Sequence, residues 1–457
     1  MEKNEECELE IIDHGMDLEG IAKKEDMVIF VPGAIKGEKV KIKIIKKNRS
    51  YAIGKIEAFL TKSENRCEPF CEVYKRCGGC NAQHLSYSEQ LLLKQEMVKN
   101  VLLKQKVEYQ TLHSTLGMGI PLYYRNKVQY PIRANANGEM EMGFYAKRSH
   151  DLIQNTECPI QNERLDAIAK YVFTILKENE FSGYDEKRNI GDIRHIMVRR
   201  GLHTGEVMVV IIVNHKEKDF LDRLKKIAIL MEQNVEDIVS VYVNINDSKT
   251  NEILGKEEVL LSGKEYIFDY IGEKKYAISP KSFFQVNTIQ AEVLYETLRK
   301  MLHLKGDETL FDLYSGVGSI GIFLSDFVGK VYGIEIEKQA VQMANINIQN
   351  NQVKNAEYIA GSVEEKIVEF QKRNIVPDVI VVDPPRKGLD EKSIEYLLQF
   401  RPKKIGYVSC KPSTLARDLK LLERCYNVVE IVPVDMFPQT SNVECVAVLQ
   451  LNKKCNR

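Results

Sequence analysis

Hydrophobic and polar positions alternate in the first sixty residues, which predicts a small unit of β-strands. Lys39–Ile44 alternates strictly, and a second alternating run covers Tyr51–Ile56. Lys36–Lys55 contains eight lysine or arginine residues and one acid, Glu38. Alternating lysines share one face of a small barrel, where they could bind a nucleic-acid backbone. An ordinary solvated strand face guarded by lysines remains the alternative interpretation.

The middle of the chain mixes helical and strand patterns. Ser86–Lys104 has apolar residues at helical spacing, and Ser86 with Glu89 fits a capping box. From Tyr123 to about Tyr270, strand-like Val207–Val213 and Ile238–Val243 lie on either side of a helical Phe220–Met231. No internal repeat is evident in this region.

Beyond about Lys275 the pattern changes to short apolar runs separated by helical stretches. This alternation predicts an α/β domain with a doubly wound parallel sheet. We therefore expect three domains, covering residues 1–58, 59–275 and 276–457. The apolar runs expected to form the sheet are Leu310–Leu313, Val331–Ile334, Val379–Val382 and Ile405–Val408.

Length, charge and hydropathy argue against a globally basic nucleic-acid-binding protein, a membrane protein and a secreted protein. The 457 residues carry 65 basic and 65 acidic side chains, so any nucleic-acid binding must come from local basic patches. The longest aliphatic run, Val207–Val213, is far shorter than the roughly 20 residues of a membrane helix. The acidic N-terminus lacks the apolar core of a signal peptide. We expect a cytoplasmic protein that does not enter a membrane.

The first motif, Phe311–Gly321, reads FDLYSGVGSIG and places a glycine-rich turn between a strand and a helix. Glu335 follows the next strand, where a carboxylate can bind the hydroxyl groups of a ribose. A plain tight turn or a dinucleotide enzyme would share this pattern. The rest of the domain shows no residues arranged for hydride transfer.

Three further motifs follow or precede strands of the same domain. Asp383 begins Asp-Pro-Pro-Arg directly after an apolar strand, where ligands gather in open α/β sheets. Cys410 follows the next strand, and its proximity to Lys411 and a helix start could lower its thiol pKa. Glu444 precedes a terminal strand and could act as a general base or be a surface carboxylate. Cys445 has no motif of its own and is expected to pack as a buried thiol.

The cysteines cluster in one segment. Cys67, Cys71, Cys77 and Cys80 fall within 14 residues, with Gly78 and Gly79 between the last two. In a chain of this kind, clustering favours a metal or metal-cluster site over disulfides.

Together, these motifs in this order resemble the RNA (uracil-5-)-methyltransferases that use S-adenosylmethionine, and specifically their 23S rRNA branch. The likeness covers nearly the whole chain. Residues 1–58 resemble a TRAM domain, residues 59–275 the family's iron–sulfur-bearing domain, and residues 276–457 the methyltransferase domain.

The resemblance implies a role for each site residue. Cys410 matches the nucleophile, Glu444 matches the base, and Phe283 matches a ring beside the target base. Asp383 lies in the family between the cofactor and the flipped base, so it could contact either. The cofactor or substrate contacts implied in this way are Gln285, Tyr314, Glu335 and Asp383.

The implied mechanism agrees with the chemistry of uracil. Carbon 5 of uracil is a poor nucleophile toward a sulfonium methyl group. Addition of the Cys410 thiolate at carbon 6 makes an enolate that attacks through carbon 5. A base must then remove the proton from carbon 5, which is the role implied for Glu444. The target base must first be flipped out of the folded RNA.

The resemblance also implies a [4Fe–4S] cluster held by Cys71, Cys77, Cys80 and Cys158, while Cys67 is an additional thiol. Spacing alone would equally allow a zinc site of four thiolates. The tRNA branch of the family typically lacks both the TRAM domain and the cluster. The resemblance therefore favours 23S rRNA as the partner, with no obligate protein partner evident.

Other functions remain open on the sequence. A nicotinamide or flavin oxidoreductase with an iron–sulfur relay would have no use for Cys410. A non-catalytic RNA-binding assembly factor would bind RNA without making product. A tRNA (uracil-5-)-methyltransferase or a cytosine-5 RNA methyltransferase would share the thiol chemistry, since groups near Asp383 decide the base.

Overall fold

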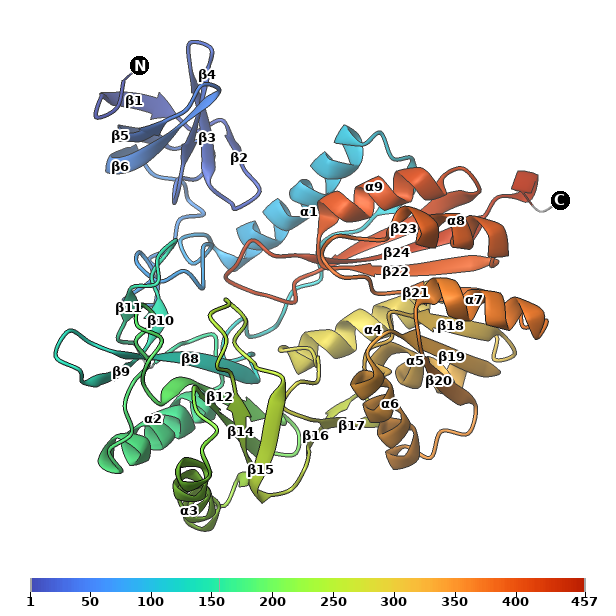
Figure 1. Cartoon of the computed structure of the whole chain (residues 1–457). Helices are drawn as coiled ribbons and strands as arrows, with labels where there is room; N and C mark the ends of the chain where they lie inside the picture. Colours follow the sequence, from blue (N-terminus) through green and yellow to red (C-terminus); the bar gives the residue numbers. More distant parts are fainter. Residues whose placement is uncertain (1, 156, 456–457) are drawn as a thin grey trace.

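Three large sheets organise the chain in the computed structural model, which describes residues 2–155 and 157–455 (Figure 1). The N-terminal sheet has the strand order β1–β5–β6–β4–β3–β2 and covers the expected β unit. Its strands are β1 (Glu6–Glu10), β2 (Asp13–His14), β3 (Gly20–Lys24), β4 (Met27–Val31), β5 (Lys39–Lys47) and β6 (Tyr51–Thr61).

Lys39, Lys41 and Lys43 of β5 do share one face, but acids lie opposite them. Strand β1 pairs antiparallel with β5, and its alternating glutamates face the lysine row. The Lys41 ammonium lies 2.8 Å from the Glu6 carboxylate. Glu38, the one acid within the stripe, is buried and forms a two-pronged ion pair with Arg66. The predicted basic stripe is therefore part of a mixed-charge surface. The sequence pattern of β5 could not show this, because it does not reveal that β1 is the neighbouring strand. The facing pairs are Glu6 with Lys43, Glu8 with Lys41, and Glu10 with Lys39.

The central sheet has the order β15–β14–β13–β12–β8–β9, with helices α2 (Glu163–Glu178) and α3 (Lys218–Asn234) on one face (Figure 1). The predicted strand Val207–Val213 is found with those bounds as β13, and the helix expected at Phe220–Met231 lies inside α3. The other strands are β8 (Lys127–Ala134), β9 (Met140–Met142), β12 (Ile193–Arg200), β14 (Ile238–Ile245) and β15 (Glu257–Gly263). Two hairpins flank the sheet: β10 (Phe144–Tyr145) with β11 (Leu152–Ile153), and β16 (Ile267–Ile271) with β17 (Lys274–Ile278).

The C-terminal sheet confirms the predicted doubly wound α/β domain. Its order is β20–β19–β18–β21–β22–β24–β23–β7, and the first five strands are parallel. The strands are β18 (Thr309–Leu313), β19 (Lys330–Glu335), β20 (Ala356–Ala360), β21 (Val379–Val382), β22 (Lys404–Ser409), β23 (Tyr426–Val434), β24 (Glu444–Leu451) and β7 (Tyr109–Leu112).

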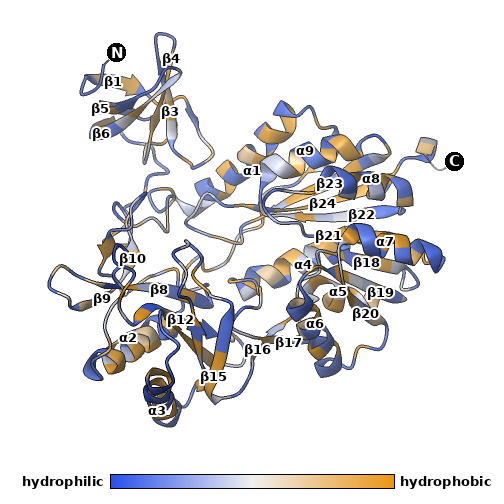
Figure 2. Ribbon diagram, in the orientation of Figure 1, coloured by the Kyte–Doolittle hydropathy of each residue, from blue (hydrophilic) through white to orange (hydrophobic). Residues whose placement is uncertain are grey.

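Helices connect the strands of this sheet and bury apolar faces against it. Helix α7 turns Val363, Ile367 and Phe370 inward, and Figure 2 shows its hydrophilic residues on the other side. None of the helices in the described residues has the length and apolarity of a membrane span. The helices are α4 (Thr288–Leu302), α5 (Ser319–Leu324), α6 (Lys338–Asn350), α7 (Val363–Lys372), α8 (Glu391–Phe400) and α9 (Pro412–Leu422), with short 3₁₀ turns at Ser325–Phe327 and Lys453–Cys455.

One segment of the expected central domain, residues 59–275, packs on the C-terminal sheet instead. Helix α1 (Tyr87–Lys104) begins after Ser86, whose side chain accepts a hydrogen bond from the Glu89 amide as the capping box predicted. This helix packs on α9, and β7 pairs with β23. Residues 87–112 thus belong to the C-terminal domain and not to the central one. The four residues of β7, YQTL, carry no apolar pattern that would have revealed this.

Candidate active site

The chemistry-bearing loops meet at one edge of the C-terminal sheet. From β18 the chain winds outward through β19 to β20, then returns to β21 and winds the other way. The carboxyl ends of β18, β21 and β22 lie side by side because these strands are parallel neighbours. Ligands bind at such a switch point in doubly wound folds.

The glycine-rich turn after β18 is held by the strand beside it. The amide of Gly316 donates a 2.9 Å hydrogen bond to one carboxylate oxygen of Glu335, and the Glu337 amide bonds the other oxygen. Gly318 has φ +80°, and a Cβ there would lie 2.9 Å from the Tyr358 ring. The turn therefore requires glycine, and Glu335 is fixed at the end of β19 as the sequence predicted, with lone pairs left to accept further hydrogen bonds.

A buried acid beside this turn was missed in the sequence analysis. Asp312 is 1% exposed, and one carboxyl oxygen accepts a bond from the Gly321 amide. Its other oxygen, and the buried hydroxyl of Ser315, have no hydrogen-bond partner among the described residues. Burial, and then the charges of Asp383 and Glu335, raise the pKa of Asp312 to about 7. The sequence feature that could have revealed Asp312 is an acid inside a strand whose neighbouring residues are apolar.

Cys410, Glu444 and Asp383 lie close together. Strand β24 runs antiparallel to β22, and the pairing of Ser409 with Cys445 brings Glu444 beside Cys410. Glu444 is 5% exposed, and its pKa is raised to about 8 by burial and then by the charge of Asp383. Burial likewise raises the pKa of Asp383 to about 7. Three of the predicted site residues thus share one poorly hydrated space.

The expectation that the Cys410 pKa is lowered is wrong. Burial raises the thiol pKa, and the negative charges of Glu444 and Asp383 raise it further. Arg386 opposes this shift and also lowers the pKa of Glu444. Arg386 stands in the Asp-Pro-Pro-Arg motif but was given no role from sequence. It is a positive charge close to both proposed reacting groups.

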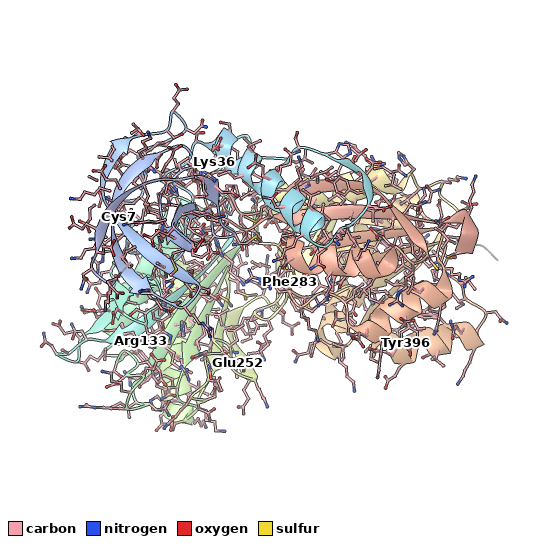
Figure 3. All side chains as sticks on the ribbon, turned by 90° about the horizontal axis from the view of Figure 1, so that it is seen from above. Cys7, Lys36, Arg133, Glu252, Phe283 and Tyr396 are labelled. Carbon is pink, nitrogen blue, oxygen red and sulfur yellow. The ribbon has the colours of Figure 1, made fainter. Side chains whose placement is uncertain are left out.

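The loop that carries Phe283 and Gln285 is held by the central domain. Arg199, at 4% exposure, donates hydrogen bonds to the carbonyls of Ser279 and Ser282. The Asn126 amide side chain donates to the Gln285 carbonyl at 2.9 Å. Phe283 is 70% exposed, and Figure 3 shows it between the central and C-terminal domains. The exposed ring therefore projects from a loop that the central domain holds in place.

Tyr314 and helix α4, which follows the loop of Phe283 and Gln285, also lie near the site. Tyr314 has φ +62°, and its phenol shares a 2.7 Å hydrogen bond with the Ser393 hydroxyl of α8. On α4, Tyr295 donates to the Ser319 hydroxyl at the start of α5. The charges of Asp383 and Glu444 also reach Tyr295. Helix α4 therefore packs against β24 and β22 close to these acids.

The four cysteines expected as cluster ligands lie in two segments, and Cys80 and Cys158 pack against the same small apolar cluster. The charge of Cys77 raises the pKa of Cys71, Cys80 and Cys158, although burial is the first cause for each. The pKa reaches about 11 for Cys80 and about 12 for Cys158. Cys67 is exposed. Across residues 2–155 and 157–455, no three His, Cys, Asp or Glu side chains converge as around a single metal ion.

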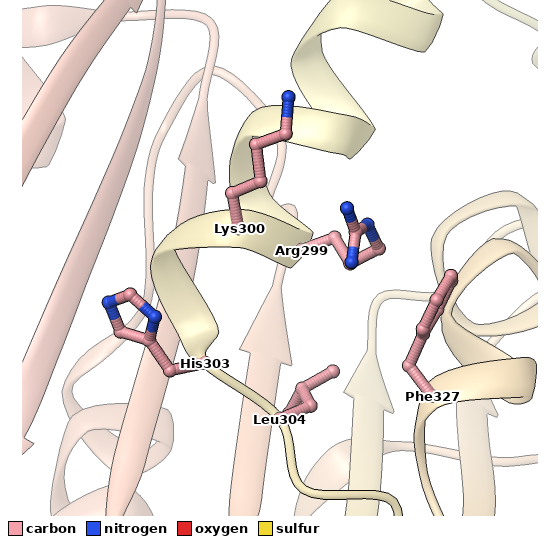
Figure 4. A pocket seen from close by; sticks show the side chains of 5 residues that line it. All are labelled: Arg299, Lys300, His303, Leu304 and Phe327. Atoms are coloured by element: carbon pink, nitrogen blue, oxygen red, sulfur yellow. The ribbon is translucent and has the colours of Figure 1, made fainter.

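A different pocket lies at the opposite edge of the sheet. It is lined by the end of α4 and by Phe327, with Arg299 stacked over the Phe327 ring (Figure 4). Arg299 and Lys300 both pair with Glu296. Because α4 ends where β18 is about to begin, this pocket is remote from Cys410 and takes no part in the site.

The fold and this edge define an S-adenosylmethionine-dependent methyltransferase. Residues 86–453 match the tRNA (uracil-5-)-methyltransferase model, and residues 2–56 match the TRAM domain. The chain belongs to the tRNA (uracil-5-)-methyltransferase family.

Relatives and solved structures agree with this family. The chain is 44% identical to an uncharacterized RNA methyltransferase of Clostridium tetani, covering 98% of this chain and 97% of that one. An uncharacterized RNA methyltransferase of Listeria monocytogenes is 43% identical, with 99% of each chain covered. The tRNA (uracil-54, C5)-methyltransferase of Pyrococcus abyssi, solved with S-adenosyl-L-homocysteine, is 29% identical with a TM-score of 0.77, covering 97% of this chain and 99% of that one.

This last likeness removes one argument for ribosomal RNA. The Pyrococcus protein acts on tRNA, yet it aligns with nearly the whole of this chain, including the N-terminal domain. The presence of a TRAM domain therefore does not separate rRNA from tRNA enzymes.

The residues at the sheet edge fit S-adenosylmethionine. The fixed Glu335 carboxylate can accept bonds from ribose hydroxyls, and Ile336 beside it is 67% exposed and offers an apolar surface. The unpartnered oxygen of Asp312 and hydroxyl of Ser315 lie at the same turn. The acidic residues are suited to a positively charged sulfonium ligand.

The raised pKa of Glu444 predicts a pH-dependent effect of Glu444→Gln on stability. The folded state favours the neutral acid, so wild-type stability is highest below the ordinary value of 4.5 and falls as pH rises through about 8. Glutamine does not titrate. The difference in unfolding free energy between the variant and wild type should therefore shift in favour of the variant by about 2 kcal/mol or more when the pH is raised from about 5 to about 9.

Urea unfolding at about pH 5 and about pH 9 measures the unfolding free energies of the variant and wild type. The control is Glu257→Gln, because Glu257 is exposed. A difference between Glu444→Gln and wild type that does not change with pH would contradict the assignment of a raised pKa to Glu444.

Proposed function

We propose that this enzyme makes 5-methyluridine in structured RNA through a covalent adduct between Cys410 and carbon 6 of uracil. The observation that carries the proposal is the pairing of β22 with β24, which puts Cys410 beside Glu444 at the switch point. A thiol and a carboxyl group there supply the two groups that the reaction needs. A cytosine-5 enzyme would use the same thiol, and the family favours uracil.

The charges around Cys410 imply that S-adenosylmethionine binds before the thiolate adds to the base. S-adenosylmethionine, when bound, supplies an electrophilic methyl group and a positive charge. A positive charge at this edge lowers the pKa of Cys410, Asp383 and Glu444 alike. The Cys410 thiol then loses its proton to solvent and the thiolate adds to carbon 6. The electron pair of the 5,6 double bond moves into an enolate with the carbon 4 oxygen, which makes carbon 5 nucleophilic. Arg386 offsets the negative charge of the acids near the thiolate.

Glu444 acts in the second half of the reaction. After methyl transfer, carbon 5 carries both the methyl group and its original hydrogen. The Glu444 carboxylate takes that proton, the bond between carbon 6 and the Cys410 sulfur breaks, and 5-methyluridine is released. Without the base, the RNA stays attached to the protein.

The remaining site residues bind and orient the ligands. We assign Glu335 and Tyr314 to the cofactor because they border the glycine-rich turn. Gln285 also belongs to this group, on the loop held by Asn126. The exposed Phe283 ring would stack beside the flipped base. Asp383 lies near both reacting groups and is assigned to the cofactor, with a contact to the base as the alternative.

Mutation of the nucleophile tests this mechanism. Cys410→Ser should lower methyl transfer by more than about 10³-fold, because a serine hydroxyl is a far weaker nucleophile without an activating base. Binding of S-adenosylmethionine, followed by calorimetry, should remain. The matched control is Cys445→Ser, at a buried thiol outside the reaction. Normal product from Cys410→Ser would rule out the covalent mechanism.

We propose large-subunit 23S rRNA in the cytoplasm as the substrate, supported by the resemblance of the cysteine set to that branch of the family. The likeness to the Pyrococcus enzyme favours tRNA as the second candidate. Labelled methyl groups should appear in 5-methyluridine of 23S rRNA when the enzyme is given separated, unmodified rRNA and tRNA. Label found only in tRNA would contradict rRNA as the substrate but would be consistent with the proposed mechanism.

We also propose that Cys71, Cys77, Cys80 and Cys158 hold a [4Fe–4S] cluster. The support is the resemblance of the cysteine set to the family's ligands, together with the packing of Cys80 and Cys158 against one apolar cluster, and zinc is the alternative. Cys77→Ser should abolish the brown absorbance and the iron content of protein purified without oxygen, whereas Cys67→Ser should leave both unchanged. A colourless wild type that contains zinc would contradict the cluster.

A further inference from the structure

The loop that leads into Glu444 is held by side chains from outside its own strands. Residues 435–443, here called the base loop, connect β23 to β24. Lys94 on α1 forms a fully buried ion pair with Asp435, with 2.5 Å between the ammonium nitrogen and a carboxylate oxygen. Gln90, one turn earlier, exchanges two 3.0 Å hydrogen bonds with Gln439. Gln439 has φ +69°, a conformation that costs energy and needs such external support.

Asn81 makes the last set of contacts before Glu444. Its side-chain oxygen accepts a 2.8 Å bond from the Ser441 amide, and its side-chain nitrogen donates to the Ser441 hydroxyl at 3.0 Å. The backbone amides of Asn81 and Ala82 both donate to the Gln439 carbonyl. The same side-chain nitrogen donates to the Asp17 carbonyl of the N-terminal domain at 3.0 Å. One residue thus joins the base loop to a different domain.

The position of Asn81 in the chain adds a third connection. It directly follows Cys80, the last cysteine of the cysteine loop (residues 71–80). That loop is itself fixed against the central domain, since Cys77 pairs with Ala146. Asn81 therefore connects the cysteine loop and the N-terminal domain to Ser441, three residues before Glu444.

We propose that Asn81 is a positioning residue that aligns Glu444 for proton removal and couples this alignment to the cysteine loop and the N-terminal domain. The inference rests on the proposed role of Glu444 as the base. Cys410 follows β22 and lies outside the base loop, so the thiol keeps its place when Asn81 changes. Loss of Asn81 should therefore impair the step that needs Glu444 and spare the steps that need only Cys410.

RNA carrying tritium at carbon 5 of uridine separates the two steps. In a single turnover, transfer of a carbon-14-labelled methyl group reports the first step, and tritium release reports proton removal. Asn81→Ala should keep methyl transfer within about threefold of wild type and slow tritium release by at least about tenfold, since a misplacement of about 1 Å can cost about 10²-fold. A protein–RNA adduct that survives denaturation should accumulate, as for Glu444→Gln.

Two further variants separate positioning from general damage. Asn65→Ala is the matched control, because Asn65 is exposed and bonds Glu89 instead of the base loop. Asn81→Asp keeps the acceptor for the Ser441 amide but loses both donated bonds, so its tritium release should fall between Asn81→Ala and wild type. If Asn81→Ala does not fold, as judged by thermal melting, Asn81→Asp must still show the selective loss.

The outcomes distinguish this inference from the proposed function. Equal slowing of methyl transfer and tritium release in a folded Asn81 variant would overturn the positioning role, as would normal rates for both. A wild type that makes methylated RNA without releasing tritium would overturn the proposed function, and the role of Asn81 with it.

Discussion

The burial of negative charge at one sheet edge is the constraint on which the site depends. Asp312, Asp383 and Glu444 all have pKa values raised to about 7 or 8, mainly because they have lost water. The Cys410 thiol lies in the same field and is also kept protonated. The site thus favours a positively charged ligand, and a sulfonium group bound there would shift the acids and the thiol toward the charged forms that the proposed reaction needs.

The sheet topology places these groups, and side chains from outside the sheet hold their loops in position. Arg199 and Asn126 reach from the central domain to the loop of Phe283 and Gln285. Lys94 and Asn81 reach from the preceding segment to the loop before Glu444. These contacts tie the loops of the site to the central domain, to α1, and through the bond from Asn81 to Asp17 also to the N-terminal domain.

Much of the fold could be predicted from the sequence, since apolar runs bounded by turns mark β13 and β21 with their observed bounds. The edge loops were also predictable, because each motif directly follows or precedes an apolar run. Contacts between distant segments could not be predicted. The acids opposite the β5 lysines, the pairing of β7 with β23 and the upward shift of the Cys410 pKa all depend on neighbours that no local pattern reveals.

The central claim is that Cys410 forms a covalent bond to the target base before Glu444 removes a proton from carbon 5. RNA in which 5-fluorouridine replaces uridine tests it most directly, because fluorine cannot be removed as a proton and the reaction stops at the adduct. Mass spectrometry of the digested complex should find the peptide containing Cys410 joined to a methylated 5-fluorouracil nucleotide. An adduct on another residue, or no adduct from enzyme that still methylates uridine, would contradict the account.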